Sequence, residues 1–358
     1  SPAPLKSVHS TVHTQHVKRD PPFCYVSQNG FTNNTYVPYS DQKHTSLIVA
    51  APIPASQVKS SSACNYRVLM MKRNAKSSFI NAHVFPGGNI DEHDYDSRWS
   101  EIIAPGGHAY YDEESKRMLA HKICAIRETY EEAGLLLTNP PNLHIPTSWR
   151  EKVHADASEF RKMCAEHKMA PSACNLYHFS NWITPVMEKR RYNTQFFITV
   201  ISEAKGEEHT LIQADGGETI QLDWYTPEEA LDAWKRGEIT LYPPQWYSLH
   251  ILKQTPRYQD IVANAGVGAF RTRTGKVVTV MPQPQGAPEG SAEEKEGFHI
   301  FLAYPGDSTY EGPGLKTTEH GQHRLYIKKE GAKFTDMKLV RTVDVDDIVQ
   351  DDTMKANL

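Results

Sequence analysis

The sequence is poor in cysteine, and its cysteines show no metal-binding spacing. The five cysteines among the 358 residues are Cys24, Cys64, Cys124, Cys164 and Cys174. Their number is odd and no two of them are separated by only two residues, which argues against a zinc ribbon or a disulfide scaffold. We therefore favour a reducing compartment. Because Cys124 falls within a helical apolar pattern, we expect it to be a core residue.

Two further absences exclude classes of partner. No apolar run approaches the roughly 20 residues that span a bilayer, so we expect no membrane partner. Lys and Arg total 39 against 43 Asp and Glu, a formal charge of -4. Without an excess of positive charge, we expect neither sequence-independent binding to nucleic acid phosphates nor sequence-specific binding of nucleic acid. The pattern indicates no particular oligomeric state.

Both ends of the chain carry candidate targeting signals. Residues 1–19 contain Lys6, Lys18 and Arg19 and no acid, which is typical of a transit-like leader, while a flexible tail over 1–40 fits as well. The final residues Ala356-Asn357-Leu358 are similar to a small–polar–Leu peroxisomal signal in which asparagine replaces the usual basic residue. We therefore expect a peroxisomal protein, with a mitochondrial one as the alternative.

Strand-like and helix-like patterns alternate over residues 41–256. The predicted strands are Ser46–Pro54, Tyr66–Lys72, Asn181–Val186, Thr194–Ser202 and Ile220–Tyr225. The predicted helices are Glu113–Ala133, Ser148–His167, one that follows Thr226, and Pro243–Gln254. The second begins with a capping box at Ser148 and Glu151, and the third with a capping box at Thr226 and Glu229. Residues 257–358 are β-like, with a long mobile loop expected at 282–297. The patterns predict an α/β protein with a mixed sheet and a β-rich C-terminal extension packed on it.

The helix predicted over Glu113–Ala133 carries one apolar stripe, and Gly134 stands where it should end. Positions that repeat every three or four residues share one face of a helix. The stripe therefore predicts a side that packs on the core, made of Leu119, Ile123, Ile126 and Tyr130.

The last turns of the same helix are acidic. Glu128, Glu131 and Glu132 follow one another at i, i+3 and i+4, so their carboxylates project from one face. Like charges repel unless a cation gathers them, and Mg²⁺ or Mn²⁺ does so through oxygen ligands. Arg127 can orient Glu131 by a charge-assisted hydrogen bond. A solvated acidic face is the alternative; the arginine and the Gly87-Gly88 turn, where backbone can approach a metal or phosphate, favour the metal site.

These residues resemble a known signature. Phe85-Pro86-Gly87-Gly88, followed later by Arg127-Glu128-x-x-Glu131-Glu132-x-Gly134-Leu135, is similar to the Nudix box. In that box the second glycine lies fourteen positions before the arginine, whereas here it lies 39 positions before it. We place the insertion of about 25 residues at about 89–112, where it could lid the site. Counted eight residues back from Arg127, the early glutamate of the box falls on Leu119, so we expect this acid to be missing.

The insertion is typical of the coenzyme A diphosphatase-like branch of the Nudix hydrolases, and segments such as Leu241–Tyr247 also match that branch. The resemblance implies a Nudix-type α/β/α sandwich over 41–256 and an Mg²⁺- or Mn²⁺-dependent hydrolase. It also implies that coenzyme A or acyl-coenzyme A is split into adenosine 3′,5′-bisphosphate and a phosphopantetheine. One alternative is a Nudix hydrolase of NADH, ADP-ribose or capped RNA. Another is a Nudix-fold protein that binds a nucleotide or a partner without cleaving it.

The resemblance also assigns roles to residues. Glu128, Glu131 and Glu132 would hold the metal, with the carbonyl of Gly87 or Gly88 completing its shell and Arg127 orienting the acids. The general base would be Glu128, whose pKa its like-charged neighbours raise, or Glu218, on a glycine-rich approach to a strand. The residues expected to bind substrate are Arg73, Gly87, Arg191, Tyr242 and Gln245.

Overall fold

A computed structural model describes most of the chain between residues 43 and 349. The described ranges are 43–58, 63–73, 82–103, 112–141, 145–188, 190–201, 219–311, 315–316, 318–331 and 333–349. The predicted tail over 1–40, Glu218 and the C-terminal signal lie outside these ranges, so the interpretations placed on them stay predictions.

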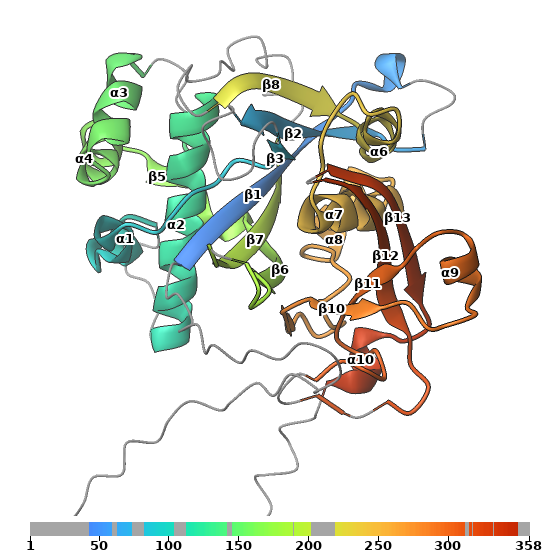
Figure 1. The fold of residues 1–358 in the computed structure, drawn as a ribbon. Helices are drawn as coiled ribbons and strands as arrows, with labels where there is room; N and C mark the ends of the chain where they lie inside the picture. Colours follow the sequence, from blue (N-terminus) through green and yellow to red (C-terminus); the bar gives the residue numbers. More distant parts are fainter. Residues whose placement is uncertain are drawn as a thin grey trace, which may run out of the picture. The chain divides into compact units, whose positions relative to one another are not determined.

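A mixed sheet of seven strands lies at the centre of the fold (Figure 1). Its order is β3-β2-β1-β7-β6-β9, and β8 pairs with β2. The pairs β1–β7 and β6–β9 are parallel, and the other pairs are antiparallel. The strands are β1 (Lys43–Pro52), β2 (Tyr66–Arg73), β3 (His83–Val84), β6 (Tyr177–Ile183), β7 (Asn193–Val200), β8 (Thr219–Tyr225) and β9 (Thr279–Val280).

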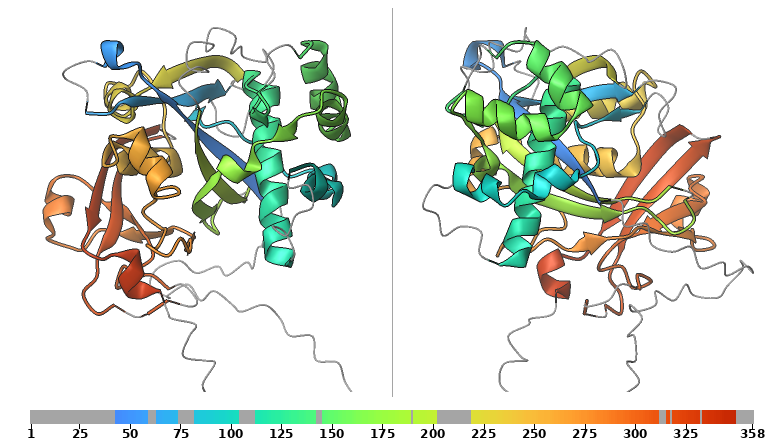
Figure 2. Two further views of the ribbon diagram at one scale, coloured as in Figure 1. Left: turned by 180° about the vertical axis from the view of Figure 1, so that it is seen from behind. Right: turned by 90° about the vertical axis from the view of Figure 1, so that its left-hand side faces the viewer.

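Both faces of this sheet are buried. Successive side chains of a strand point to opposite faces, and in β1 Leu47 and Val49 enter one apolar core whereas Ile48 and Ala50 enter the other. The helix α2 (Glu113–Ala133) lies on the first face, and α6 (Pro227–Lys235) and α7 (Pro243–Lys253) lie on the second (Figures 1 and 2). This arrangement confirms the predicted α/β/α sandwich.

The helix α2 has the predicted bounds. The side chain of Asp112 accepts a hydrogen bond from the N–H of Ser115 at its start, and Gly134 ends it with a φ of 72°. The predicted apolar stripe is buried, and Cys124 is fully buried as well. The acidic face is not a solvated surface, because Glu131 and Glu132 are only 6% and 5% exposed.

The helix predicted over Ser148–His167 is in fact two helices, α3 (Ser148–Ala155) and α4 (Ser158–Glu166). Asp156 is extended at the break, and its side chain accepts a hydrogen bond from the N–H of Ser158. Short acidic side chains compete in this way with helix continuation. The capping box predicted at Ser148 is wrong, because Thr147 is the N-cap and makes no side-chain cap. The box at Thr226 and Glu229 is confirmed.

The box insertion and the connections form short elements. The stretch predicted to hold the insertion, 89–112, contains a 3-10 helix, η2 (Glu92–Tyr95), followed by α1 (Arg98–Ile103). In Figure 1, α1, α3 and α4 lie on the outer side of α2. The remaining short elements are η1 (Ala55–Gln57), β4 (Thr138–Asn139), β5 (Ala170–Pro171), η3 (Ala173–Asn175) and α8 (Tyr258–Ala263).

A second, antiparallel sheet confirms the predicted β-rich C-terminal extension (Figure 2). Its strands are β10 (Gln283–Gly286), β11 (Ile300–Ala303), β12 (His323–Glu330) and β13 (Lys333–Arg341), and α10 (Val345–Ile348) follows. Tyr247 of α7 hydrogen-bonds to His323 of β12, and the two elements share one apolar core. The mobile loop predicted at 282–297 is wrong, because β10 and α9 (Ala292–Lys295) lie there. An edge strand such as β10 tolerates proline.

No helix within the described ranges is both long and apolar enough to cross a membrane.

Candidate active site

Two glycines place a loop between β1 and α2. A Cβ on Gly87 would lie 2.1 Å from the carbonyl oxygen of Thr45, so only glycine lets this loop lie against β1. A Cβ on Gly88 would lie 2.3 Å from the Cδ of Glu128. The carbonyl of Gly88 accepts a hydrogen bond from the N–H of Thr45 at 2.9 Å. The backbone thus approaches a strand on one side and a box glutamate on the other.

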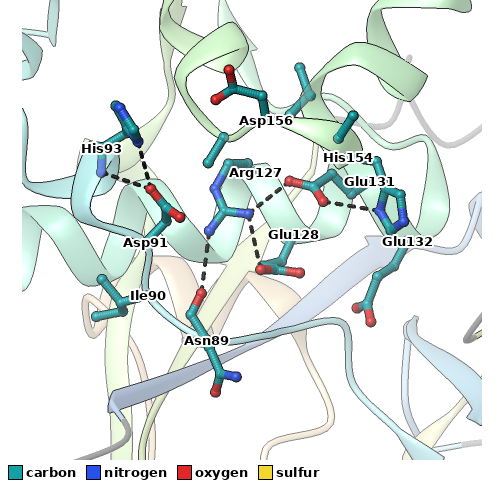
Figure 3. A pocket seen from close by; sticks show the side chains of 13 residues that line it. Asn89, Ile90, Asp91, His93, Arg127, Glu128, Glu131, Glu132, His154 and Asp156 are labelled. Atoms are coloured by element: carbon teal, nitrogen blue, oxygen red, sulfur yellow. Dashed lines mark hydrogen bonds and ion pairs between the residues drawn. The ribbon is translucent and has the colours of Figure 1, made fainter.

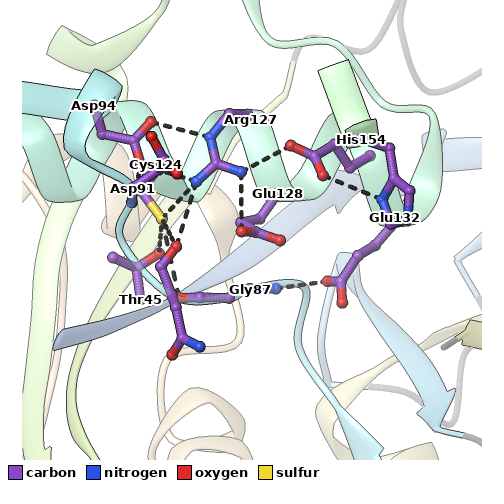
Figure 4. Close-up of polar contacts among 12 residues, drawn as sticks. Thr45, Gly87, Asp91, Asp94, Cys124, Arg127, Glu128, Glu132 and His154 are labelled. Carbon is purple, nitrogen blue, oxygen red and sulfur yellow. Dashed lines mark hydrogen bonds and ion pairs between the residues drawn. The ribbon is translucent and has the colours of Figure 1, made fainter. Parts of the chain in front are cut away.

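Arg127 joins the acids of the site (Figure 4). Its Nη1 lies 2.7 Å from Glu131 Oε1 and 3.0 Å from Glu128 Oε1. Its Nε and Nη2 donate to the two carboxylate oxygens of Asp94 at 3.0 and 2.8 Å. The hydrogen bond predicted between Arg127 and Glu131 is therefore present. Because the Arg127 side chain is only 5% exposed, these carboxylates hold it in one orientation.

Asp94 occupies the place of the early acid in the box. In the usual spacing that acid lies six residues after the second glycine, and Asp94 lies six residues after Gly88. Leu119, on which the backward count falls, is instead packed in the apolar core. Counting forward from Gly88 thus reaches an aspartate in place of the early glutamate, because the inserted residues follow Asp94 and shift any count made from Arg127.

Glu132 is held by the glycine loop. Its Oε2 accepts a hydrogen bond from the Gly87 N–H at 2.8 Å, and its Oε1 lies 3.5 Å from Arg73 Nη2. Arg73 also donates to the carbonyl of Gly87 at 3.3 Å. Arg73 and Gly87, both predicted to bind substrate, thus lie beside a box glutamate.

The carboxyl of Glu128 has a raised pKa. Burial raises the pKa of its carboxyl to about 7; the charge of Arg127 opposes this shift and that of Glu131 adds to it. Near neutral pH the group is therefore present both with and without its proton. This is the property that a general base at this position requires.

Arg127 and the three box glutamates line an open cavity of about 470 Å³ (Figure 3). Its walls are the acidic face of α2, the loop from Asn89 to His93 and the turn between α3 and α4. His154 reaches in from α3, and its Nδ1 lies 3.3 Å from Glu131 Oε2. Among the described lining residues one, Arg127, carries a guanidinium and five carry carboxylates, namely Asp91, Glu128, Glu131, Glu132 and Asp156.

The charge of this cavity fits a divalent cation. Within the described ranges, no three His, Cys, Asp or Glu side chains form a ready-made metal site. The five carboxylates nevertheless outnumber the one guanidinium in the lining, and clefts of one sign of charge concentrate the opposite ion. Carboxylate oxygens are also the ligands that Mg²⁺ and Mn²⁺ prefer. Glu128, Glu131 and Glu132 stay the predicted ligands of such an ion.

None of the five predicted substrate-binding residues lines the cavity; Arg73 and Gly87 contact Glu132 beside it, and the other three lie elsewhere. Arg191 donates to the carbonyl of Thr184 at 3.1 Å and lies against the sulfur of Met281. Tyr242 packs edge-on against Phe334 of the C-terminal sheet, and Gln245 lies on α7.

The structure adds residues that the sequence analysis did not single out. Asp91, His93 and Asp94 come from the acidic run directly after the glycines, and this run was the available signal. His154 and Asp156 had no local signal, because the fold brings the α3–α4 turn to the cavity. All except Asp94 line the cavity.

Comparisons with known proteins agree with this geometry. The family model described as the NUDT19 Nudix domain matches residues 42–117 and 108–252. The protein named acyl-coenzyme A diphosphatase NUDT19 from Xenopus laevis is 32% identical over an alignment of 229 residues, and the match covers 52% of this chain and 59% of that protein. The human protein of the same name is 29% identical over 240 residues, covering 55% of this chain and 63% of its own length. The chain thus spans less than two thirds of these relatives.

A solved structure shares the fold. The NUDIX hydrolase from Alicyclobacillus acidocaldarius superposes with a TM-score of 0.52 at 19% identity. The match covers 65% of this chain and 100% of that one, and it supports the α/β/α architecture alone.

Proposed function

This chain belongs to the NUDT19 Nudix domain family, and we propose that it hydrolyses the diphosphate linkage of coenzyme A or acyl-coenzyme A with Mg²⁺ or Mn²⁺. The products are adenosine 3′,5′-bisphosphate and phosphopantetheine or its acyl form. One observation carries the reaction class: three box glutamates and Arg127 line one acidic cavity. The names of the relatives, acyl-coenzyme A diphosphatases, support the choice of substrate.

The residues of the cavity have different roles in the proposed reaction. A bound divalent cation neutralises phosphate oxygens and lowers the pKa of water. Glu131 and Glu132 would hold the ion together with Glu128, and Arg127 orients Glu128 and Glu131 by hydrogen bonds. Glu128 is one candidate for the group that takes up the proton of the attacking water, because its carboxylate lines the cavity. Glu218 remains the second candidate for the base.

Arg73 is proposed to contact a substrate phosphate. It lies next to Glu132 and Gly87, and its side chain is 18% exposed. A guanidinium beside Glu132 would offer charge-assisted hydrogen bonds to phosphate oxygens. Replacing it should therefore raise KM for the substrate more than it lowers kcat.

The test of this function is direct. The purified chain is incubated with Mg²⁺ or Mn²⁺ and with coenzyme A, an acyl-coenzyme A, ADP-ribose, NADH and a dinucleoside polyphosphate, and products are identified by mass spectrometry. We expect phosphopantetheine from coenzyme A. Glu131→Gln and Glu132→Gln should each lower turnover by more than about 100-fold. A residue that only supports a metal ligand typically contributes a factor of at most about 100, so a larger loss indicates a direct ligand.

Glu113→Gln is the matched control, because Glu113 is exposed at the other end of α2. Near-wild-type turnover in both glutamine variants, with the fold intact, would refute the assignment of the site. Cleavage of ADP-ribose or NADH in place of coenzyme A would reassign the substrate. No product from any compound would favour a Nudix-fold protein that binds without cleaving.

A further inference from the structure

Trp99 of α1 contacts two segments that are distant in the sequence. Its indole Nε1–H donates to the carbonyl of His93 in η2 at 3.0 Å. Its ring packs against Phe160 of α4, with ring centroids 5.6 Å apart. Trp99 is 2% exposed and Phe160 is fully buried. A buried indole of this kind specifies the position of both neighbours, since its donor must be satisfied and its bulk must be packed.

An ion pair joins the same two segments. Arg161 Nε of α4 lies 3.0 Å from Asp96 Oδ2, directly after η2. Arg98 shares this carboxylate, and the side chain of Asp96 is 14% exposed. The start of the box insertion is thus attached to α4 by an aromatic contact and by an ion pair.

This attachment lies next to the acid that orients Arg127. The carbonyl held by Trp99 belongs to His93, the residue before Asp94. The Asp94 carboxylate accepts hydrogen bonds from the N–H of Asp91 at 2.9 Å and from Arg127. A shift of η2 therefore moves Asp94 relative to Arg127, which in turn contacts Glu128 and Glu131.

We propose that Trp99 and Arg161 are positioning residues of the active site, which fasten the box insertion to α4 so that Asp94 holds Arg127 in place. Neither residue lines the cavity. The effect on turnover rests on the proposed hydrolase function, whereas the effects on η2 and on cation binding do not require turnover.

Two substitutions separate the two contacts. Trp99→Phe keeps an aromatic ring against Phe160 and removes the donor to His93. Arg161→Ala removes the ion pair with Asp96. Outer-shell partners of a metal site typically contribute a factor of 10 to 100, so each variant should weaken Mn²⁺ binding by about tenfold. kcat should fall by a similar factor, while KM for coenzyme A changes little because no substrate contact is lost.

Three measurements test the proposal on the full chain. Mn²⁺ binding is followed by the electron paramagnetic resonance signal of the free ion. Hydrogen–deuterium exchange is measured for the peptide that covers η2, and thermal denaturation monitors folding. Lys162→Ala is the matched control: Lys162 is next in sequence, carries the same charge and pairs with Glu159 on its own helix. Arg161→Lys should restore part of the affinity.

The expected result is faster exchange in η2 and weaker Mn²⁺ binding in Trp99→Phe and Arg161→Ala, with Lys162→Ala like the wild type. Wild-type exchange and affinity in both folded variants would overturn the proposal, and so would an equal loss in Lys162→Ala. If Trp99→Phe fails to fold, Arg161→Ala alone decides. If the wild type cleaves nothing, the hydrolase proposal fails, and exchange in η2 still decides whether the insertion is fastened in this way.

Discussion

Asp94 and Arg127 form a bidentate ion pair between the two ends of the box insertion, with donor–acceptor distances of 3.0 and 2.8 Å. The two side chains are only 2% and 5% exposed. Arg127 also contacts Glu128 and Glu131, so one buried guanidinium links the early acid of the box to two of its glutamates.

Asp94→Asn should destabilise the protein and disturb the site together. The amide keeps the size of the side chain but removes a charge that faces buried Arg127. Losing a hydrogen bond to a charged group costs about 2 kcal/mol in the free energy of unfolding. Urea denaturation measures this loss, and Asp94→Glu should recover part of it. The control is Asp112→Asn, which keeps a residue able to cap α2 at an exposed position. An unchanged unfolding midpoint in Asp94→Asn would contradict the role of the pair.

Gly87→Ala and Gly88→Ala should have different consequences although the residues are neighbours. The new Cβ of the first meets the backbone of β1, which cannot move aside, so thermal stability should fall. The atoms nearest to the new Cβ of the second are those at the end of the Glu128 side chain, so the fold should persist while that carboxylate is displaced. Misplacing a reacting group by about 1 Å can cost roughly 100-fold in rate. Equal melting temperatures for the two variants would argue against this difference.

Stability should fall in mild acid, in part because of His121. Burial lowers the pKa of its imidazole from 6.5 to about 3, and its Nδ1 has no hydrogen-bond partner among the described residues. As pH falls below 6.5 the unfolded chain takes up this proton and the folded chain does not, so the free energy of unfolding decreases down to about pH 3. At pH 5 the loss is about 2 kcal/mol for one such group.

His121→Leu should therefore lose less stability than the wild type between pH 7.5 and pH 5. Urea unfolding at the two pH values measures the difference. Part of the acid sensitivity should remain, because burial also lowers the pKa of His178, to about 4. Identical losses in variant and wild type would show that His121 is protonated in the folded protein as well.

Divalent cation binding should strengthen as pH rises toward neutrality. Folding raises the pKa of Glu128 from 4.5 to about 7, so in the metal-free protein the charged form is disfavoured and stability decreases as pH rises through this window. A cation requires the charged form and competes with the proton, which reduces affinity by up to about tenfold per pH unit below 7. Mn²⁺ titrations from pH 5.5 to 8 measure this slope. Glu128→Gln should flatten it, and an equal slope in that variant would assign the proton to another group.

Much of the active-site helix was predictable from its sequence. The bounds of α2 follow from a capping aspartate and a terminal glycine, and the spacing of Glu128, Glu131 and Glu132 places them on one face. These features depend on backbone hydrogen bonds between residues close in sequence, so a short segment contains the information. The same holds for the continuous apolar run Leu47–Ala51 of β1, which marks a strand buried on both faces.

The partners of that helix were decided by tertiary structure. The count of eight residues back from Arg127 reached Leu119, because an insertion lengthens the distance between the glycines and the arginine of the box. Only the folded chain shows that Asp94 contacts the Arg127 guanidinium. His154 lies beside Glu131, and Trp99 packs against Phe160, although no local pattern connects these segments. Tyr242 packs against the C-terminal sheet and does not line the cavity. Neighbours along a helix are set by its own geometry, but neighbours across the fold depend on how distant elements pack.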